Sequence, residues 1–263
     1  MKNIHNHQQI FSIDDRRELI IPGNLNETIQ FCVNQFLEIG NQAIREKDFF
    51  TVALSGGSTP SAIFKELAKE GNREKIDWNK VLCFWSDERS VPPNNPENNC
   101  YSAMQSGLNQ VPLLPEHIYR MQAEKNIQQN SLFYEKLIHE KVPNNRFDLI
   151  MLGMGEDGHT ASLFPHTDAL QVSDRLVIEN EVPQKNTWRM TFTYPCINQA
   201  HHICIYVLGK NKAKMVREVL IDSENNFENL PIQKIGTEEN KALWILDQEA
   251  SSLLNEHPQK IND

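Results

Sequence analysis

A histidine and two acidic residues follow an apolar run and a glycine-rich turn near the middle of the chain. The run opens the segment FDLIMLGMGEDGHTASLFP, residues 147–165, and is typical of a parallel strand buried on both faces. His159 can take or give a proton near neutral pH, and Asp157 is near enough in sequence to orient its imidazole. The glycines, Gly155 among them, allow a sharp turn and a close approach to a ligand. We therefore expect His159 and Asp157 to be catalytic. The alternative is that His159 is an ordinary buried histidine without a catalytic role.

The same glycines match the GxGxxG fingerprint of dinucleotide-binding proteins, but two features argue against that function. Glu156 and Asp157 stand inside the turn, and their carboxylates would repel a pyrophosphate. The fingerprint also usually opens the first strand and helix of its domain, whereas this one lies past the middle of the chain. We therefore expect no nicotinamide, flavin or other cofactor, and no metal.

A second glycine-rich loop, SGGSTP, follows the apolar run at residues 51–54. Free backbone amides, hydroxyl groups and a helix that begins with proline are what a phosphate oxygen requires. The loop lacks the lysine of a nucleotide triphosphate site, which favours a sugar phosphate as the ligand. We expect Thr59 to be the N-cap of this helix, and an ordinary glycine turn with that cap is the alternative to a phosphate site. The candidate phosphate-binding residues are Ser55, Gly56, Gly57, Ser58 and Thr59.

Charged residues follow a third apolar run at residues 81–85. Asp87, Glu88 and Arg89 are expected to project toward one rim, where Arg89 could clamp a carboxylate or phosphate. Arg189 lies near the start of a later strand and Lys212 at a helix start, so the three cations could together offset a phosphate dianion. Ordinary surface ion pairs are the alternative.

The composition indicates one globular domain over residues 1–263, with polar ends at residues 1–9 and 257–263 that we expect to fray. The net charge of −9 argues against nucleic acid and against a membrane surface. Five cysteines without a CxxC pair fit reduced thiols, and no segment is long and apolar enough to span a bilayer. A cytoplasmic protein is the expectation, as a monomer or small homo-oligomer.

Apolar periodicity gives the order of the elements. It predicts helices over residues 24–47, 127–140 and 210–220, and strands over residues 51–54, 81–85, 190–194, 203–208 and 243–246 in addition to the central one. Alternating strands and helices imply a single α/β domain with a Rossmann-like, mainly parallel sheet and helices on both faces. Ligands of such sheets bind beyond the carboxyl ends of the strands, where the three loops above would meet. The tryptophans Trp85, Trp188 and Trp244 are interpreted as packing residues.

Four segments together resemble the 6-phosphogluconolactonase family, a branch of the group that includes glucosamine-6-phosphate deaminases. They are VALSGGSTP, FWSDERSVPP, FDLIMLGMGEDGHTASLFP, and WRMTFTYPCINQA with GKNKAK. The residues after His159, Thr160 to Phe164, are similar to lactonases, whereas deaminases carry an AFNEP-like continuation. The resemblance thus favours lactone hydrolysis over deamination, with a non-catalytic sugar-phosphate sensor as a further alternative.

The resemblance also implies roles for single residues. His159 would be the base that activates water, and Arg89, Arg189 and Lys212 would hold the phosphate and hydroxyls of 6-phosphoglucono-1,5-lactone. Asp87 and Asn99 would line the site together with the loop from Ser55 to Thr59. One departure is Cys100, because relatives often have Ser-Asn-Tyr where this chain has Asn98, Asn99, Cys100 and Tyr101. A contact from the position after Asn99 is therefore in question.

Overall fold

The structure of the protein, a computed structural model, describes residues 9–222 and 224–254. The ends that we expect to fray, residues 1–9 and 257–263, lie outside these residues except for Gln9. The strands are β1 (Phe11–Ser12), β2 (Arg17–Ile20), β3 (Phe50–Leu54), β4 (Val81–Trp85), β5 (Asp87–Arg89), β6 (Leu149–Leu152), β7 (Val177–Val182), β8 (Thr187–Phe192), β9 (His202–Val207) and β10 (Ala242–Leu246). The α-helices are α1 (Leu25–Lys47), α2 (Ser58–Leu67), α3 (Glu70–Arg73), α4 (Asn99–Gln105), α5 (Ile127–Lys141), α6 (Tyr194–Asn198) and α7 (Ala213–Arg217).

The main sheet has the strand order β1-β2-β10-β9-β6-β3-β4, and every pair in it except β1 with β2 is parallel. The chain runs outward from β3 to β4 and then returns to place β6 on the other side of β3. The strand order therefore reverses between β3 and β6, which is the point where open α/β sheets bind their ligands. The two glycine-rich loops follow these two strands.

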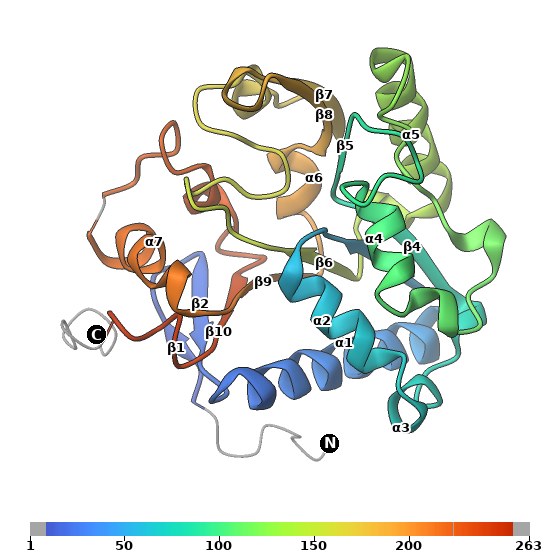
Figure 1. The fold of residues 1–263 in the computed structure, drawn as a ribbon, viewed down its shortest axis with the longest axis horizontal. Helices are drawn as coiled ribbons and strands as arrows, with labels where there is room; N and C mark the ends of the chain where they lie inside the picture. Colours follow the sequence, from blue (N-terminus) through green and yellow to red (C-terminus); the bar gives the residue numbers. More distant parts are fainter. Residues whose placement is uncertain (1–8, 223, 255–263) are drawn as a thin grey trace.

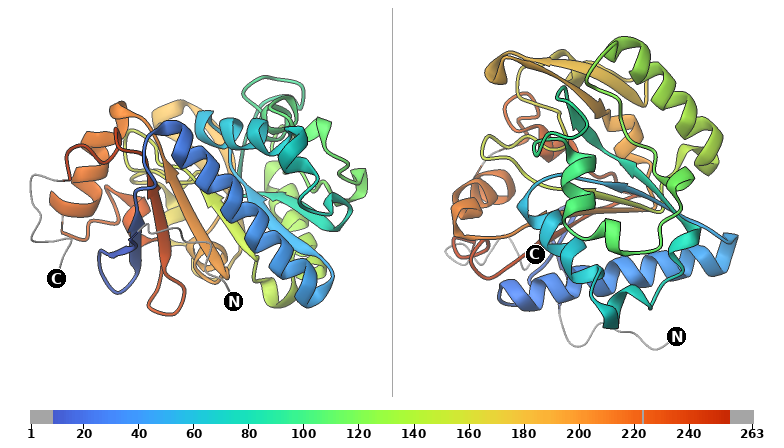
Figure 2. Two further views of the ribbon diagram at one scale, coloured as in Figure 1. Left: turned by 90° about the horizontal axis from the view of Figure 1, so that it is seen from below. Right: turned by 45° about the vertical axis from the view of Figure 1, so that its right-hand side comes forward.

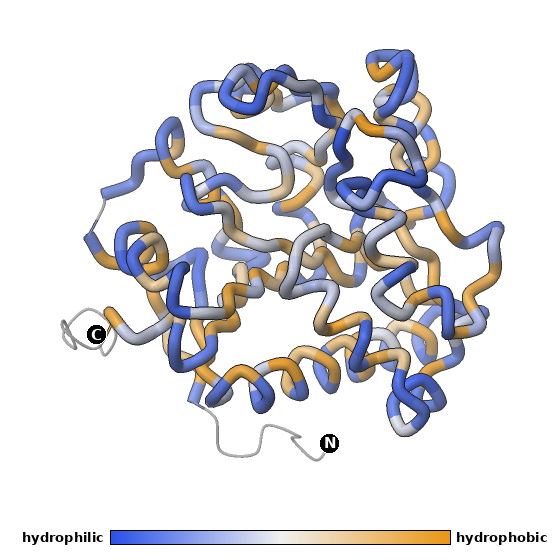
Figure 3. Tube along the Cα trace, in the orientation of Figure 1, coloured by the Kyte–Doolittle hydropathy of each residue, from blue (hydrophilic) through white to orange (hydrophobic). Residues whose placement is uncertain are grey.

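Helices cover both faces of this sheet, as Figures 1 and 2 show. Consecutive strand residues point to opposite faces, so Val52 belongs to the cluster that contains Phe36 of α1, while Ala53 belongs to the cluster that contains Tyr134 of α5. Both positions are fully buried, which explains the uninterrupted apolar runs in the sequence. The hydropathy trace in Figure 3 follows the same division, with apolar residues along the strands and polar residues on the outer surface of α1. The predicted mainly parallel α/β fold is confirmed.

A second, antiparallel sheet of β5, β8 and β7 lies beside the main one. In Figure 1 it lies above the main sheet, next to α5, and α5 contacts β7. Its register places Arg89 directly opposite Arg189. The sequence analysis did not predict β7. It interpreted residues 87–89 as a loop, because a strand of three charged residues carries no apolar pattern.

Three local expectations were wrong. Helix α2 begins at Ser58 with Gly57 at the N-cap, so Thr59 does not cap it. The single helix expected over residues 210–220 is divided into a 3-10 turn (Lys210–Lys212), α7 and a π-helical turn (Glu218–Asp222). Trp188 is 38% exposed and is not a core residue, whereas Trp85 and Trp244 are fully buried. Within residues 9–222 and 224–254, no helix combines the length and apolarity needed to cross a membrane.

Candidate active site

The loops after β3, β4 and β6 meet in one pocket with a volume of about 170 Å³. They come from neighbouring parallel strands, whose carboxyl ends lie at the same edge of the sheet. Helix α4 closes the pocket from the side with Asn99. Of the residues proposed from the sequence, Ser55, Gly56, Gly57, Asp87, Arg89, Asn99, Gly155 and His159 line it.

His159 and Asp157 form a direct pair. The Nδ1 atom of the imidazole lies 2.5 Å from Oδ1 of Asp157, and the ring stacks on Phe164 with 4.0 Å between the centroids. Partial burial raises the pKa of the Asp157 carboxyl, but the hydrogen bond and charge of His159 outweigh it and lower that pKa to about 2. Asp157 is therefore ionised at neutral pH and accepts a hydrogen bond from the Nδ1–H group, which leaves Nε2 as the atom that can exchange a proton. Glu156, the other acid of the turn, is exposed.

Gly155 makes room for this pair. A Cβ atom at this position would lie 2.1 Å from Nδ1 of His159 and 2.7 Å from Oδ1 of Asp157. Its N–H donates to the carbonyl of His159 at 2.8 Å, so the turn is closed on itself. At Gly153, by contrast, a Cβ atom would meet nothing within 4 Å. The close approach that the sequence predicts for Gly155 is therefore an approach to the imidazole.

Asp87 and Asn99 are held in a buried hydrogen-bond network at the pocket wall. Asn99 donates through Nδ2 to the Asp87 carboxylate at 3.0 Å, and Ser162 donates through Oγ to its other oxygen at 2.7 Å. Gly56 allows the loop after β3 to approach the same amide, because a Cβ atom there would lie 1.9 Å from Oδ1 of Asn99. The sequence reading did not single out Ser162, whose position three residues after His159 was the available signal.

Glu88 points away from the pocket, contrary to the expectation that all three residues of its triplet share one rim. Its side chain is fully buried, since neighbouring residues of a strand face opposite sides. The carboxylate accepts backbone N–H groups from Arg89 at 2.8 Å, from Asn99 at 2.7 Å and from Cys100 at 3.0 Å. Burial raises the pKa of Glu88 to about 7, although these hydrogen bonds act in the opposite direction. Glu88 therefore fixes the backbone of Arg89 and Asn99, and Cys100 contributes to this arrangement through its backbone.

The two arginines lie side by side. Arg89 and Arg189 are partners across β5 and β8, and Arg89 donates through Nη1 to the carbonyl of Glu97 at 2.8 Å. Burial and then the charge of Arg89 lower the pKa of the Arg189 guanidinium. Among the described residues, no hydrogen-bond partner meets the buried Nε of Arg189. Two adjacent cations with an unsatisfied donor are what an anionic ligand would complete.

The remaining proposed residues lie around this pocket. Lys212 donates through Nζ to the carbonyl of Met154 at 2.9 Å, so it is located at the turn that carries His159. Ser58 and Thr59 are in the first turn of α2, directly after the loop that lines the pocket. In residues 9–222 and 224–254 there is no group of three or more His, Cys, Asp or Glu side chains that could hold a metal ion. The absence of a cofactor stays a prediction.

Comparisons with known proteins agree with the resemblance seen in the motifs. The family described as glucosamine-6-phosphate isomerases/6-phosphogluconolactonase matches residues 24–244. A 6-phosphogluconolactonase of Chlamydia pneumoniae is 36% identical over 242 residues, covering 92% of this chain and 92% of that protein. A 6-phosphogluconolactonase of a Nostoc species is 36% identical over 221 residues, covering 81% of this chain and 88% of that protein.

Solved structures show the same fold. The crystal structure of 6-phosphogluconolactonase from Thermotoga maritima superimposes with a TM-score of 0.74 at 26% identity, covering 87% of this chain and 98% of that one. A monomeric glucosamine-6-phosphate deaminase gives a TM-score of 0.74 over 89% of this chain and 99% of its own, at 18% identity. The second likeness concerns the fold alone, so the fold does not separate the two activities.

Proposed function

The chain belongs to the glucosamine-6-phosphate isomerase/6-phosphogluconolactonase family, and on that premise we propose that it hydrolyses 6-phosphoglucono-1,5-lactone to 6-phosphogluconate. This reaction is a step of the oxidative pentose phosphate pathway. The observation that carries the proposal is that the His159–Asp157 pair shares a pocket with Arg89, which adjoins Arg189. The pocket thus combines a group for proton transfer with groups for an anion. The names of the relatives at 36% identity support the same activity.

His159 is the proposed general base. Its Nε2 atom takes a proton from water as the water oxygen bonds to the lactone carbonyl carbon, while ionised Asp157 holds the Nδ1 proton and stabilises the imidazolium. The bond between the carbonyl carbon and the ring oxygen then breaks, and the imidazolium returns the proton to that oxygen. The products are a carboxylic acid and a hydroxyl group on one open chain, and the acid releases its proton to water to give the carboxylate. The stacked Phe164 ring keeps the imidazole plane fixed during both transfers.

The negative charge that develops on the carbonyl oxygen during the attack needs a hydrogen-bond donor that stabilises it. The N–H of Gly155 is already bonded to the carbonyl of His159, so it is not free for this role. We assign the role to Lys212, whose ammonium group lies at Met154, beside the same turn. Because a lactone is already reactive, placement of the water and this charge would supply most of the acceleration.

The phosphate group fits the other side of the pocket. Helix α2 starts there without a side-chain cap, so its first N–H groups and its dipole are available to an anion. Arg89 lines the same pocket as Gly56 and Gly57, which directly precede the helix, and Arg189 lies opposite Arg89 across β5 and β8. A phosphate bound between them would give the buried Nε of Arg189 the acceptor that it lacks.

A coupled assay with freshly generated lactone tests the reaction and the substrate together. Formation of 6-phosphogluconate is followed through its dehydrogenase, and the rate of spontaneous hydrolysis, measured without protein, is subtracted. We expect turnover by the natural chain well above that background. Ammonia release from glucosamine 6-phosphate would instead identify a deaminase, and binding of the sugar phosphate without turnover would identify a sensor; either result would refute the proposal.

A further inference from the structure

A segment that contributes nothing to the pocket supports the catalytic turn from behind. Gly158 lies between Asp157 and His159 with φ at +74°, and its carbonyl accepts the backbone N–H of Ile232 at 3.1 Å. Leu230 occupies the place of a side chain here, because a Cβ atom on Gly158 would lie 2.7 Å from its Cδ2 atom. We call residues 225–235 the support segment. The position of the turn that carries the proposed base therefore depends on the position of this segment.

The regular structure of the support segment is limited to a 3-10 turn (Pro231–Lys234). Hydrogen bonds from other elements therefore hold it in place. The hydroxyl of Tyr194, on α6, donates to the carbonyl of Pro231 at 2.9 Å. The N–H of His166 donates to the carbonyl of Glu228 at 3.3 Å. The segment is thus joined both to the chain after His159 and to the helix that follows β8.

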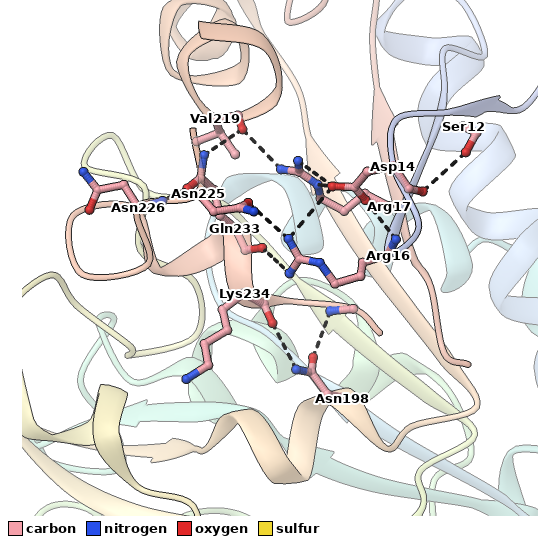
Figure 4. A network of polar contacts seen from close by, with 11 residues as sticks. Ser12, Asp14, Arg16, Arg17, Asn198, Val219, Asn225, Asn226, Gln233 and Lys234 are labelled. Atoms are coloured by element: carbon pink, nitrogen blue, oxygen red, sulfur yellow. Dashed lines mark hydrogen bonds and ion pairs between the residues drawn. The ribbon is translucent and has the colours of Figure 1, made fainter. Parts of the chain in front are cut away.

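Gln233 belongs to a further network of polar contacts, which Figure 4 shows. Its side chain is fully buried; Nε2 donates to the carbonyl of Val219 at 3.0 Å and Oε1 accepts the N–H of Asn226 at 2.8 Å. The guanidinium of Arg16 donates to the carbonyl of Gln233 at 2.9 Å and to Oδ1 of Asn225 at 3.2 Å. One buried amide therefore links both ends of the support segment to the body of the protein.

We propose that Gln233 is a positioning residue for His159. By fixing the support segment against Gly158, the Gln233 amide keeps the imidazole and Asp157 in the orientation that the reaction needs. Among the described residues, the hydrogen bonds of Gln233 reach Val219, Asn226, Arg16 and Leu230, and none of these lines the pocket. Gln233 therefore acts through Leu230 and Ile232. The inference rests on the proposed function for its kinetic consequence, whereas its structural consequence can be measured without a substrate.

The test compares Gln233→Leu with a matched control, Asn72→Leu. Leucine has nearly the volume of glutamine but removes both amide hydrogen bonds. Asn72 is also a buried amide with two side-chain hydrogen bonds, to Glu66 and Lys75, and it lies on α3 away from the pocket. Both variants are measured under conditions where they have the same free energy of unfolding. A general loss of stability is then equal in the two proteins.

Two measurements decide the outcome. Hydrogen exchange of the Gly155 amide, which is bonded to His159, should be about tenfold faster or more in Gln233→Leu and within about twofold of the natural chain in Asn72→Leu. In the lactonase assay, kcat of Gln233→Leu should fall by about tenfold while KM changes by less than about twofold, because the arginines belong to β5 and β8. If Gly155 exchange and kcat respond alike in the two variants, Gln233 is only structural and the proposal fails.

A milder variant covers the case in which Gln233→Leu does not fold. Arg16→Met removes the two hydrogen bonds to the support segment from a partly exposed position, and we expect both effects in the same direction at about threefold. An unchanged Gly155 exchange rate in this variant would overturn the proposal. If the natural chain has no lactonase activity, the proposed function fails while the exchange measurement still decides whether Gln233 positions the turn.

Discussion

Replacing Glu88 by glutamine should remove a pH dependence of stability that this buried carboxyl imposes. Its pKa of about 7 in the folded protein lies above the ordinary value of 4.5 because burial disfavours the charged form. Below pH 4.5 the carboxyl is protonated in both the folded and the unfolded chain. As the pH rises to 7, the unfolded chain releases the proton first, so the folded state loses stability relative to it. Above pH 7 the loss is complete and constant.

The size of this effect follows from the difference between the two pKa values. At 1.36 kcal/mol per pH unit, the difference corresponds to roughly 3 kcal/mol of unfolding free energy between pH 4.5 and 7.5. Glutamine does not titrate, so Glu88→Gln carries a constant offset from its altered contacts with the three N–H donors and no change with pH. The free energy of unfolding of the variant, minus that of the natural chain, should therefore rise by roughly 3 kcal/mol across this range.

Urea unfolding at half-unit steps from pH 4.5 to 8 measures this difference. Exposed Glu74 provides a matched control, since Glu74→Gln makes the same chemical change at the surface, where no buried carboxyl is replaced, and should not reproduce this rise. Parallel curves for Glu88→Gln and the natural chain would refute the reasoning. They would mean that the hydrogen bonds from Arg89, Asn99 and Cys100 fully offset the cost of burying the charge.

Three further predictions concern the proposed reaction. His159→Ala should lower kcat by about a hundredfold or more with a modest change in KM, and an unchanged rate in the coupled assay would remove His159 from the mechanism. Arg189→Ala should raise KM for the phosphorylated lactone more than for plain gluconolactone; equal losses for both would contradict a phosphate contact. Gly155→Ala should lower kcat about as much as His159→Ala, because its Cβ atom would lie 2.1 Å from the imidazole. Gly153→Ala, where a Cβ atom meets nothing within 4 Å, should keep most activity, and equal loss in both glycine variants would contradict the steric argument.

The sequence predicted those parts of the site that depend on local pattern. Apolar runs marked β3, β4 and β6, and in a parallel sheet the residues after such strands must lie at one edge. His159 and Asp157 are two residues apart, so their pairing needed only a tight turn. Asn99 was identified through the resemblance alone, because it lies in α4 after a proline-rich loop that has no periodicity.

The hydrophobic pattern of the sequence could not predict contacts between segments that are far apart in the chain. The position of Arg189 opposite Arg89 depends on the register of β5 and β8, and β5 is too short and polar to predict as a strand. The inward direction of Glu88 follows from the same strand. The role of Gln233 could not be predicted from the sequence, because its side chain bonds to Asn226 and Val219 and only the folded chain brings these residues together.

The arginine pair also has a consequence for the empty protein. Like charges directly opposite each other across two strands repel, so β5 and β8 associate against an electrostatic cost when no anion is present. The anion binding that we propose for this pair is therefore opposed by a lower stability of the empty protein. A neutral residue at position 189 would raise the stability of the empty protein and weaken its binding of an anion. Such a trade-off between stability and binding is common where a protein keeps a destabilising arrangement at a ligand site.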